Sequence, residues 1–97
     1  MSNMTKQDYI KAFRSLANEE RLDIILKLYK EGELCASDIE KSFFMEQSTT
    51  SHHLNYLKNV GLLDSRKQGR NVFYKVNVDN LKSLYKKFLT NLFDIKE

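Results

Sequence analysis

The chain has 97 residues, enough for one domain with a modest hydrophobic core and too few for two. Apolar residues make up 41% and charged residues 30%, a balance typical of soluble globular proteins rather than of disordered or membrane-spanning chains. The net charge of +3 only weakly favours an anionic partner, so the position of the charges matters more than their sum.

The sequence contains neither a secretory signal nor a run of the roughly 20 apolar residues that span a bilayer. Its single cysteine, Cys35, cannot form an internal disulfide, which fits a reducing compartment. We therefore expect a single domain over residues 1–97 that acts in the cytoplasm and has no membrane partner.

Helical spacing of apolar residues predicts two helices at the start of the chain. The first covers residues 5–17 and carries one apolar stripe. The second covers residues 19–30, with Asn18 as its N-cap and apolar residues on two faces. We therefore expect the second helix to be buried on two sides.

Two further helices follow Gly32, which ends the second. The stretch "CASDIEKSF" predicts a short third helix. A fourth helix is predicted over residues 48–60, with Ser48 as its N-cap and Gly61 at its C-terminal end.

Beyond Gly61 the apolar period changes from helical to extended. The runs "LLDSRK" and "NVFYKVN" are rich in β-forming residues and are joined through "QGR", where Gly69 can supply the positive φ of a tight turn. A last helix is predicted over residues 78–93. The predicted fold is mainly α with a small β-hairpin, in the order α-α-α-α-β-β-α, which is the organisation of a winged helix-turn-helix.

The fourth helix has two chemically distinct faces. At about 100° per residue, Thr50, Leu54 and Leu57 lie on one side, which predicts that this side is buried. The opposite side carries short hydrogen-bonding groups and no carboxylate: Ser48, His52, Asn55 and Asn59, flanked by Thr49 and Ser51. Such a face suits the base edges and phosphates of DNA.

The only two histidines, His52 and His53, are adjacent in this helix. Neighbouring helical residues diverge by about 100° and cannot readily close on one metal ion, so we predict no metal site here. We interpret His53 as a hydrogen-bonded group beneath the helix. For His52 two interpretations stay open, a contact in a DNA groove and an ordinary solvated side chain.

The hairpin, or wing, concentrates positive charge. Between residues 64 and 77 Asp64 is the only acid, against four bases: Arg66, Lys67, Arg70 and Lys75. Beside a polar helix face, these bases are well placed to hold DNA phosphates or to enter the minor groove. The alternative is a solvated basic turn without a partner.

The apolar stripes of the first and last helices exceed what a small three-helix core needs. One interpretation is that they simply cover the core. The other is that residues 5–17 and 78–93 form a two-fold homodimer interface. Such a dimer would place the fourth helices of its two subunits about one DNA turn apart.

With these features the chain resembles the ArsR/SmtB family of small bacterial winged-helix repressors. The resemblance runs from "FRSLANEERLDIILKL" through "GELCASDIEKSF" to "QSTTSHHLNYLKNVGLLDSRKQGRNVFYKV". It implies a homodimer, joined through its terminal helices, that represses its own operon and releases DNA when an inducer binds. By position it implies operator contacts in the fourth helix and the wing: Gln47, Ser48, Thr49, Ser51, His52, Arg66, Lys67 and Arg70. It also assigns His53 and Leu54 to the scaffold.

The inducer site is where the sequence departs from that family. Its arsenic, cadmium and lead sensors carry Cys-x-Cys-Asp at the start of the third helix, and here Ser37 stands in place of the second cysteine, between Cys35 and Asp38. A single thiolate binds arsenite or another soft, thiol-reactive species poorly. The zinc-type site of the last helix is also missing, because residues 78–97 contain no histidine. Cys35 therefore has three interpretations: a small buried residue on the inner face of the third helix, a redox or electrophile sensor, and a residual metalloid ligand.

The sequence shows no paired-carboxylate motif and no glycine-rich phosphate loop, so we predict neither an enzyme nor a bound cofactor. We predict a homodimeric, sequence-specific repressor with residues 48–60 in the major groove, where Asn55 joins the contacts named above, and residues 64–77 on the DNA backbone or minor groove. The alternative is a winged-helix module that binds protein through the same face. A steep salt dependence and a preference for a palindromic operator distinguish DNA binding from it.

Overall fold

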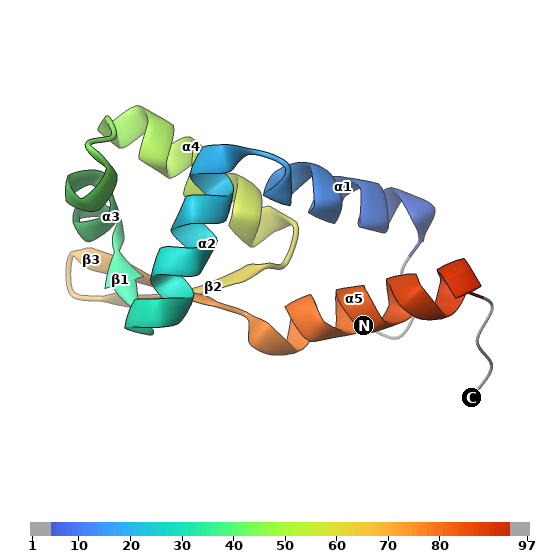
Figure 1. Ribbon diagram of the computed structural model, residues 1–97. Coiled ribbons are helices and arrows are strands. Elements are labelled where there is room, and N and C mark those ends of the chain that lie inside the picture. Colours follow the sequence, from blue (N-terminus) through green and yellow to red (C-terminus); the bar gives the residue numbers. More distant parts are fainter. Residues whose placement is uncertain (1–4, 94–97) are drawn as a thin grey trace.

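The computed structural model describes residues 5–93, so the two ends of the expected domain, residues 1–4 and 94–97, lie outside the described residues. Five helices and three strands follow one another in the described part of the chain (Figure 1): α1 (Lys6–Leu16), α2 (Glu19–Glu31), β1 (Leu34–Cys35), α3 (Ala36–Phe43), α4 (Gln47–Asn59), β2 (Leu63–Gln68), β3 (Asn71–Val76) and α5 (Val78–Phe93). This is the predicted mainly helical winged helix-turn-helix with one additional strand.

The additional strand is β1, which completes a three-stranded antiparallel sheet in the order β1-β3-β2. β2 and β3 pair along their full lengths and form the predicted hairpin. Leu34 and Cys35 of β1 lie opposite Tyr74 and Phe73 of β3. Two residues are too few to show the alternation that marks a strand in a sequence, so only this long-range pairing reveals β1.

The start of α4 differs from the prediction, because Ser48 is not its N-cap. The cap is Glu46, whose backbone is extended and whose side chain makes no capping hydrogen bond. Met45, immediately before it, packs against the core and so fixes where the chain turns into the helix. Asn18, by contrast, caps α2 as predicted, since its Oδ1 accepts a hydrogen bond of 3.0 Å from the amide of Arg21.

The core lies where α2, α3 and α4 meet the sheet, and its fully buried side chains include Ile24, Leu28, Ile39, Leu54 and Leu57. The predicted inner face of α4 is therefore correct. The prediction that α2 is buried on two sides is wrong, because Leu22, Leu26 and Tyr29 are 42%, 59% and 68% exposed. Only one face of α2 meets α4 and the sheet, so its second apolar face points to solvent.

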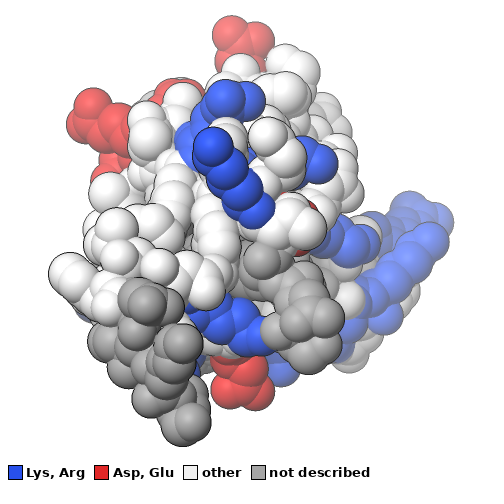
Figure 2. All heavy atoms as spheres, turned by 90° about the vertical axis from the view of Figure 1, so that its right-hand side faces the viewer, with Lys and Arg blue, Asp and Glu red and all other residues white. Residues whose placement is uncertain are grey.

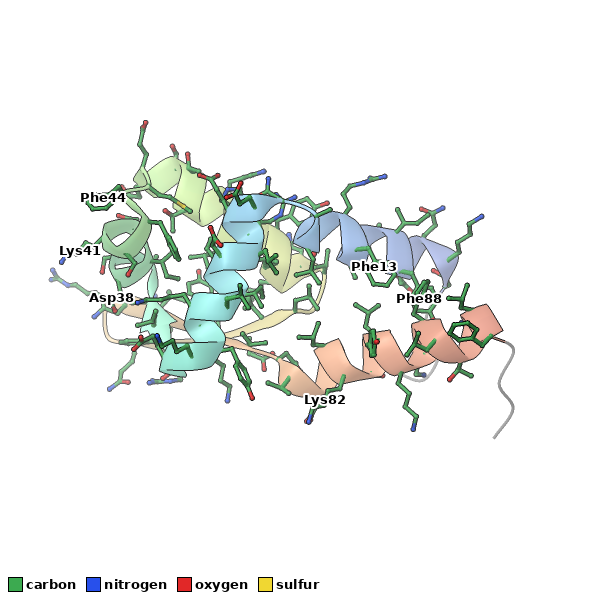
Figure 3. The ribbon with its side chains drawn as sticks, viewed as in Figure 1. Phe13, Asp38, Lys41, Phe44, Lys82 and Phe88 are labelled. Atoms are coloured by element: carbon green, nitrogen blue, oxygen red, sulfur yellow. The ribbon has the colours of Figure 1, made fainter. Side chains whose placement is uncertain are left out.

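α5 adds Leu84 to this core and then projects away from it, which gives the molecule an elongated shape (Figure 1). The Cα radius of gyration is 14.4 Å, against roughly 12.5 Å for a compact domain of this length. Near its end α5 meets α1, where Phe13 and Phe88 point toward one another with ring centroids 4.8 Å apart (Figure 3). None of the helices in residues 5–93 is long and apolar enough to cross a membrane.

Leu57→Ala should lower the free energy of unfolding by about 2–5 kcal/mol, because truncating this fully buried side chain leaves a cavity beneath α4. Asn55→Ala, on the exposed side of the same helix, should change it by less than about 0.5 kcal/mol. Urea unfolding followed by circular dichroism measures both. Similar small effects would show that the inner face of α4 is not packed as described.

Candidate nucleic-acid interface

The outer face of α4 is polar and open to solvent. Of the predicted contact residues in this helix only Thr49 is half-buried, and the others are exposed: Gln47, Ser48, Ser51, His52 and Asn55. No side chain caps the first turn, so its free amides add the positive end of the helix dipole to this face. A face of this composition can bond to base edges and to phosphate oxygens.

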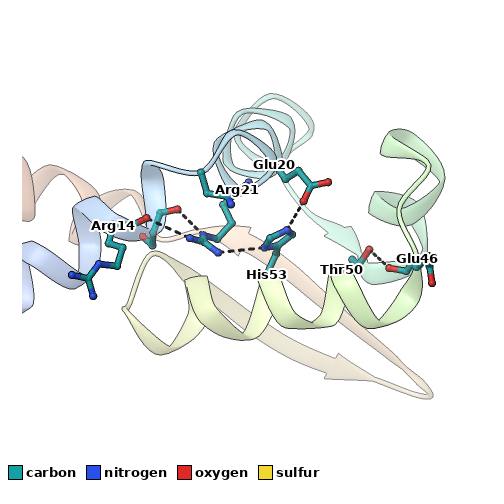
Figure 4. Close-up of polar contacts among 8 residues, drawn as sticks. Arg14, Glu20, Arg21, Glu46, Thr50 and His53 are labelled. Carbon is teal, nitrogen blue, oxygen red and sulfur yellow. Dashed lines mark hydrogen bonds and ion pairs between the residues drawn. The ribbon is translucent and has the colours of Figure 1, made fainter.

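The inner face of α4 is anchored by polar contacts as well as by leucines. Thr50 is fully buried, and its hydroxyl donates to the carbonyl of Glu46 at 3.0 Å (Figure 4). His53 is only 5% exposed, and its Nε2 lies 2.8 Å from Glu20 Oε1 while its Nδ1 lies 3.5 Å from a guanidinium nitrogen of Arg21. His53 is therefore the hydrogen-bonded scaffold group that the sequence predicted.

The tautomer of the neutral His53 ring follows from these neighbours. A guanidinium only donates hydrogen bonds, so Nδ1 of His53 must accept from Arg21. The proton of the neutral ring then sits on Nε2 and is donated to the Glu20 carboxylate. The ring is thus held from both sides in one orientation.

Arg21 extends the same cluster to α1. The side chain is 9% exposed, and its Nε donates to the carbonyl of Ser15 at 2.8 Å while a terminal nitrogen donates to the carbonyl of Arg14 at 3.4 Å (Figure 4). Its guanidinium also lies over the Tyr56 ring of α4, 4.3 Å from the centroid. We call Glu20, Arg21 and His53 the α4 anchor. Arg21 was not predicted as part of the site, although an arginine among the regularly spaced apolar residues of α2 indicates a charged group close to the core.

The wing brings together its predicted bases, but one of them is already paired. Arg66 Nε and a terminal nitrogen reach the two carboxylate oxygens of Glu33 at 2.9 and 2.7 Å, and the guanidinium lies 4.9 Å from the centroid of the Phe73 ring. Hydrogen bonds from Arg66 hold the pKa of the Glu33 carboxyl below its ordinary value, and Glu33 raises the pKa of Arg66 in turn. Nothing in the sequence marks Glu33 as a partner, because the two residues are 33 positions apart.

Lys67 and Arg70 are exposed, and neither side chain has a hydrogen bond or ion pair with the residues that the structure describes. Gly69 takes the positive φ of 63° that the hairpin turn requires, as predicted. The turn of the hairpin and the start of α4 lie at the same end of the molecule, opposite the end of α5 (Figure 1). The two free bases and the polar helix face can therefore approach one extended ligand together.

Cys35 lies at the N-cap of α3, half-buried, and not on the inner face of that helix. Its Sγ is 3.1 Å from Asp38 Oδ2 and 3.1 Å from Ser37 Oγ. One thiol with a hydroxyl and a carboxylate is a poor set of ligands for a soft metal. Within residues 5–93 no three side chains of histidine, cysteine, aspartate or glutamate are grouped so that they could hold a metal ion.

A helix-turn-helix with a polar recognition helix and a basic wing defines a class, the winged helix-turn-helix DNA-binding regulators. A family model described as "Bacterial regulatory protein, arsR family" matches residues 18–65. The chain is 34% identical over 87 residues to a cadmium resistance transcriptional regulatory protein CadC homolog of Staphylococcus aureus, covering 90% of this chain and 72% of that one. The protein belongs to the ArsR family of DNA-binding transcriptional regulators, which is not a family of enzymes.

Two further similarities extend this result. The arsenical resistance operon repressor of Escherichia coli is 43% identical over 68 residues, which are 70% of this chain and 58% of the repressor. The solution structure of Mb0332 from Mycobacterium bovis, a homodimeric winged helix-turn-helix DNA-binding domain, has a TM-score of 0.73 and 23% identity, with 100% of this chain and 94% of that one covered. The second similarity shows a shared fold.

Arg66→Gln should raise the pKa of Glu33 toward its ordinary value, because the substitution removes the guanidinium that stabilises the carboxylate. In the unmodified protein the ion pair is intact above the ordinary pKa of glutamate and is lost as the pH falls through the lower folded-state pKa. NMR titration of the Glu33 side-chain carboxyl measures the change, with Lys67→Gln as the control. An unchanged pKa in Arg66→Gln would contradict the pairing.

Proposed function

We propose that the protein is a homodimeric repressor that acts in the cytoplasm and binds a palindromic operator through α4 and the wing. The outer face of α4 carries this proposal. It presents exposed side chains that can donate and accept hydrogen bonds, on a helix whose inner face is fixed by the core and the α4 anchor. An α-helix fits the major groove, where such groups distinguish all four base pairs.

The wing supplies contacts with DNA that do not depend on the DNA sequence. Lys67 and Arg70 are free to bind phosphates or to enter the minor groove next to the helix. Arg66 must exchange the Glu33 carboxylate for a phosphate before it contributes. We therefore expect Lys67 and Arg70 to carry most of the wing's electrostatic attraction.

The apolar side chains on the terminal helices support a dimer. Phe13, Tyr85, Leu92 and Phe93 are 36%, 62%, 59% and 64% exposed. Figure 2 looks onto the end of the molecule where α1 begins and α5 ends, and shows a broad area without charged side chains there. An exposed apolar surface of this kind is typical of a protein interface. The homodimeric state of Mb0332 agrees with this interpretation.

Leu92→Lys should weaken the dimer by at least about tenfold in dissociation constant, because each interface would lose two buried leucines and gain two charges. The matched control is Leu26→Lys on α2, since both leucines are 59% exposed in the single chain. Sedimentation equilibrium over a range of protein concentrations measures both variants. Equal effects, or none, would exclude α5 from the interface.

Fluorescence anisotropy tests the DNA-binding proposal directly. The unmodified protein is titrated against the duplex upstream of its own gene and against a scrambled duplex at the same salt concentration. A preference of about a thousandfold or more is the expected result for a specific repressor. Equal weak binding to both duplexes would contradict the proposal and favour a protein-binding module.

His52→Ala should weaken binding to the operator by about 1–3 kcal/mol, because one contact with a base edge is lost. Binding to the scrambled duplex should change much less, since phosphate contacts dominate there. The same titration measures both losses. Equal losses on the two duplexes would remove His52 from base reading and leave it a solvated side chain.

A further inference from the structure

Phe44, in the turn between α3 and α4, combines two unfavourable features. It is the one residue other than glycine with a positive φ in the part of the chain that the structure describes, with φ 54° and ψ 40°. This left-handed conformation at the end of a helix usually belongs to glycine, because a side chain there is crowded by the backbone. A bulky aromatic residue in this conformation is a clear outlier, and strain of this kind is retained chiefly at functional sites.

The ring of Phe44 gains nothing from the fold to offset this strain. It is 96% exposed, more than any other large apolar side chain of the described residues. Its neighbours Phe43 and Met45 both pack against the core, so the turn directs the residues on either side inward and Phe44 outward. Figure 3 shows Phe44 pointing away from the body of the molecule, near Lys41 of α3.

The position of the turn indicates what covers the ring. Phe44 comes three residues before Gln47, the first residue of α4 and the first of the proposed operator contacts. It lies at the end of the molecule that holds the wing, and not at the end where α5 finishes. The exposed Lys41 nearby can hold a phosphate, while the ring itself has no polar atom to offer.

We infer that Phe44 packs against thymine methyl groups at the edge of the operator half-site and so helps to determine which sequence α4 reads. The inference rests on the proposed function, because it extends the DNA surface of α4 by one apolar contact. The 5-methyl group of thymine is the apolar feature of the major groove, and phenylalanine is one of the residues that contact it. Burying one methyl group against the ring contributes about a fourfold gain in affinity.

The test combines two changes at Phe44 with single thymine-to-uracil changes in the operator, each of which removes only a 5-methyl group. The unmodified protein should lose about fourfold in affinity at the contacted thymine. Phe44→Ala and Phe44→Gly should bind the thymine operator about fourfold or more weakly and should no longer respond to uracil at that position. Fluorescence anisotropy measures the dissociation constant of each protein variant with each operator.

Thermal unfolding shows whether weaker DNA binding comes from loss of the Phe44 contact or from a folding defect. Phe44→Gly should melt at or above the Tm of the unmodified protein, because glycine adopts the left-handed conformation without strain. Tyr29→Ala, which removes an exposed ring from α2, is the control and should bind both operators normally. Loss of binding together with an unchanged or higher Tm supports the inference.

Two outcomes overturn it. If the Phe44 variants bind the operator as tightly as the unmodified protein, or respond to uracil in the same way, the ring does not contact the DNA and a protein partner is the remaining occupant. If the unmodified protein itself does not prefer the operator over the scrambled duplex, the proposed function fails and the inference fails with it. The comparison between the two duplexes distinguishes these cases.

Discussion

The α4 anchor is the interaction on which the rest of the structure depends. A buried guanidinium is costly unless its donors are satisfied, and Arg21 meets this condition with carbonyls of α1, the imidazole of His53 and the ring of Tyr56. These partners lie on α1 and on α4, so Arg21 of α2 links the two helices. The orientation of α4 is therefore fixed by groups that lie up to 33 residues away in the chain.

The two faces of α4 differ in their chemistry, and the α4 anchor belongs to the inner one. The inner face contains the leucines, Thr50 and a histidine whose two nitrogens are both engaged. The outer face keeps its hydrogen-bonding groups unburied. Because the inner groups are satisfied within the fold, residues on the outer face can change without exposing a buried charge.

The sequence predicted those features that depend on local spacing. The inner face of α4, the turn at Gly69 and the start of α5 follow from periodicity and from the conformational freedom of glycine, and the structure agrees with each. The features it did not predict are set by distant partners. β1 exists only because β3 lies beside it, and Glu33 is an ordinary surface acid until the sheet brings it to Arg66. The capping role assigned to Ser48 was wrong because packing of Met45, rather than capping chemistry, decides where α4 begins. The proposed DNA contacts remain predictions.

The pairing of Glu33 with Arg66 has a consequence for how such a regulator can evolve. Glu33 belongs to the connection between α2 and β1, and its carboxylate is paired with Arg66 of the wing. If α4 and the wing bind DNA as proposed, a substitution at this one position would change how strongly the wing holds any duplex and would leave the base contacts of α4 unchanged. On that proposal, occupancy of a promoter and recognition of its sequence would be controlled by different residues, so selection could adjust the basal level of transcription without altering the operator.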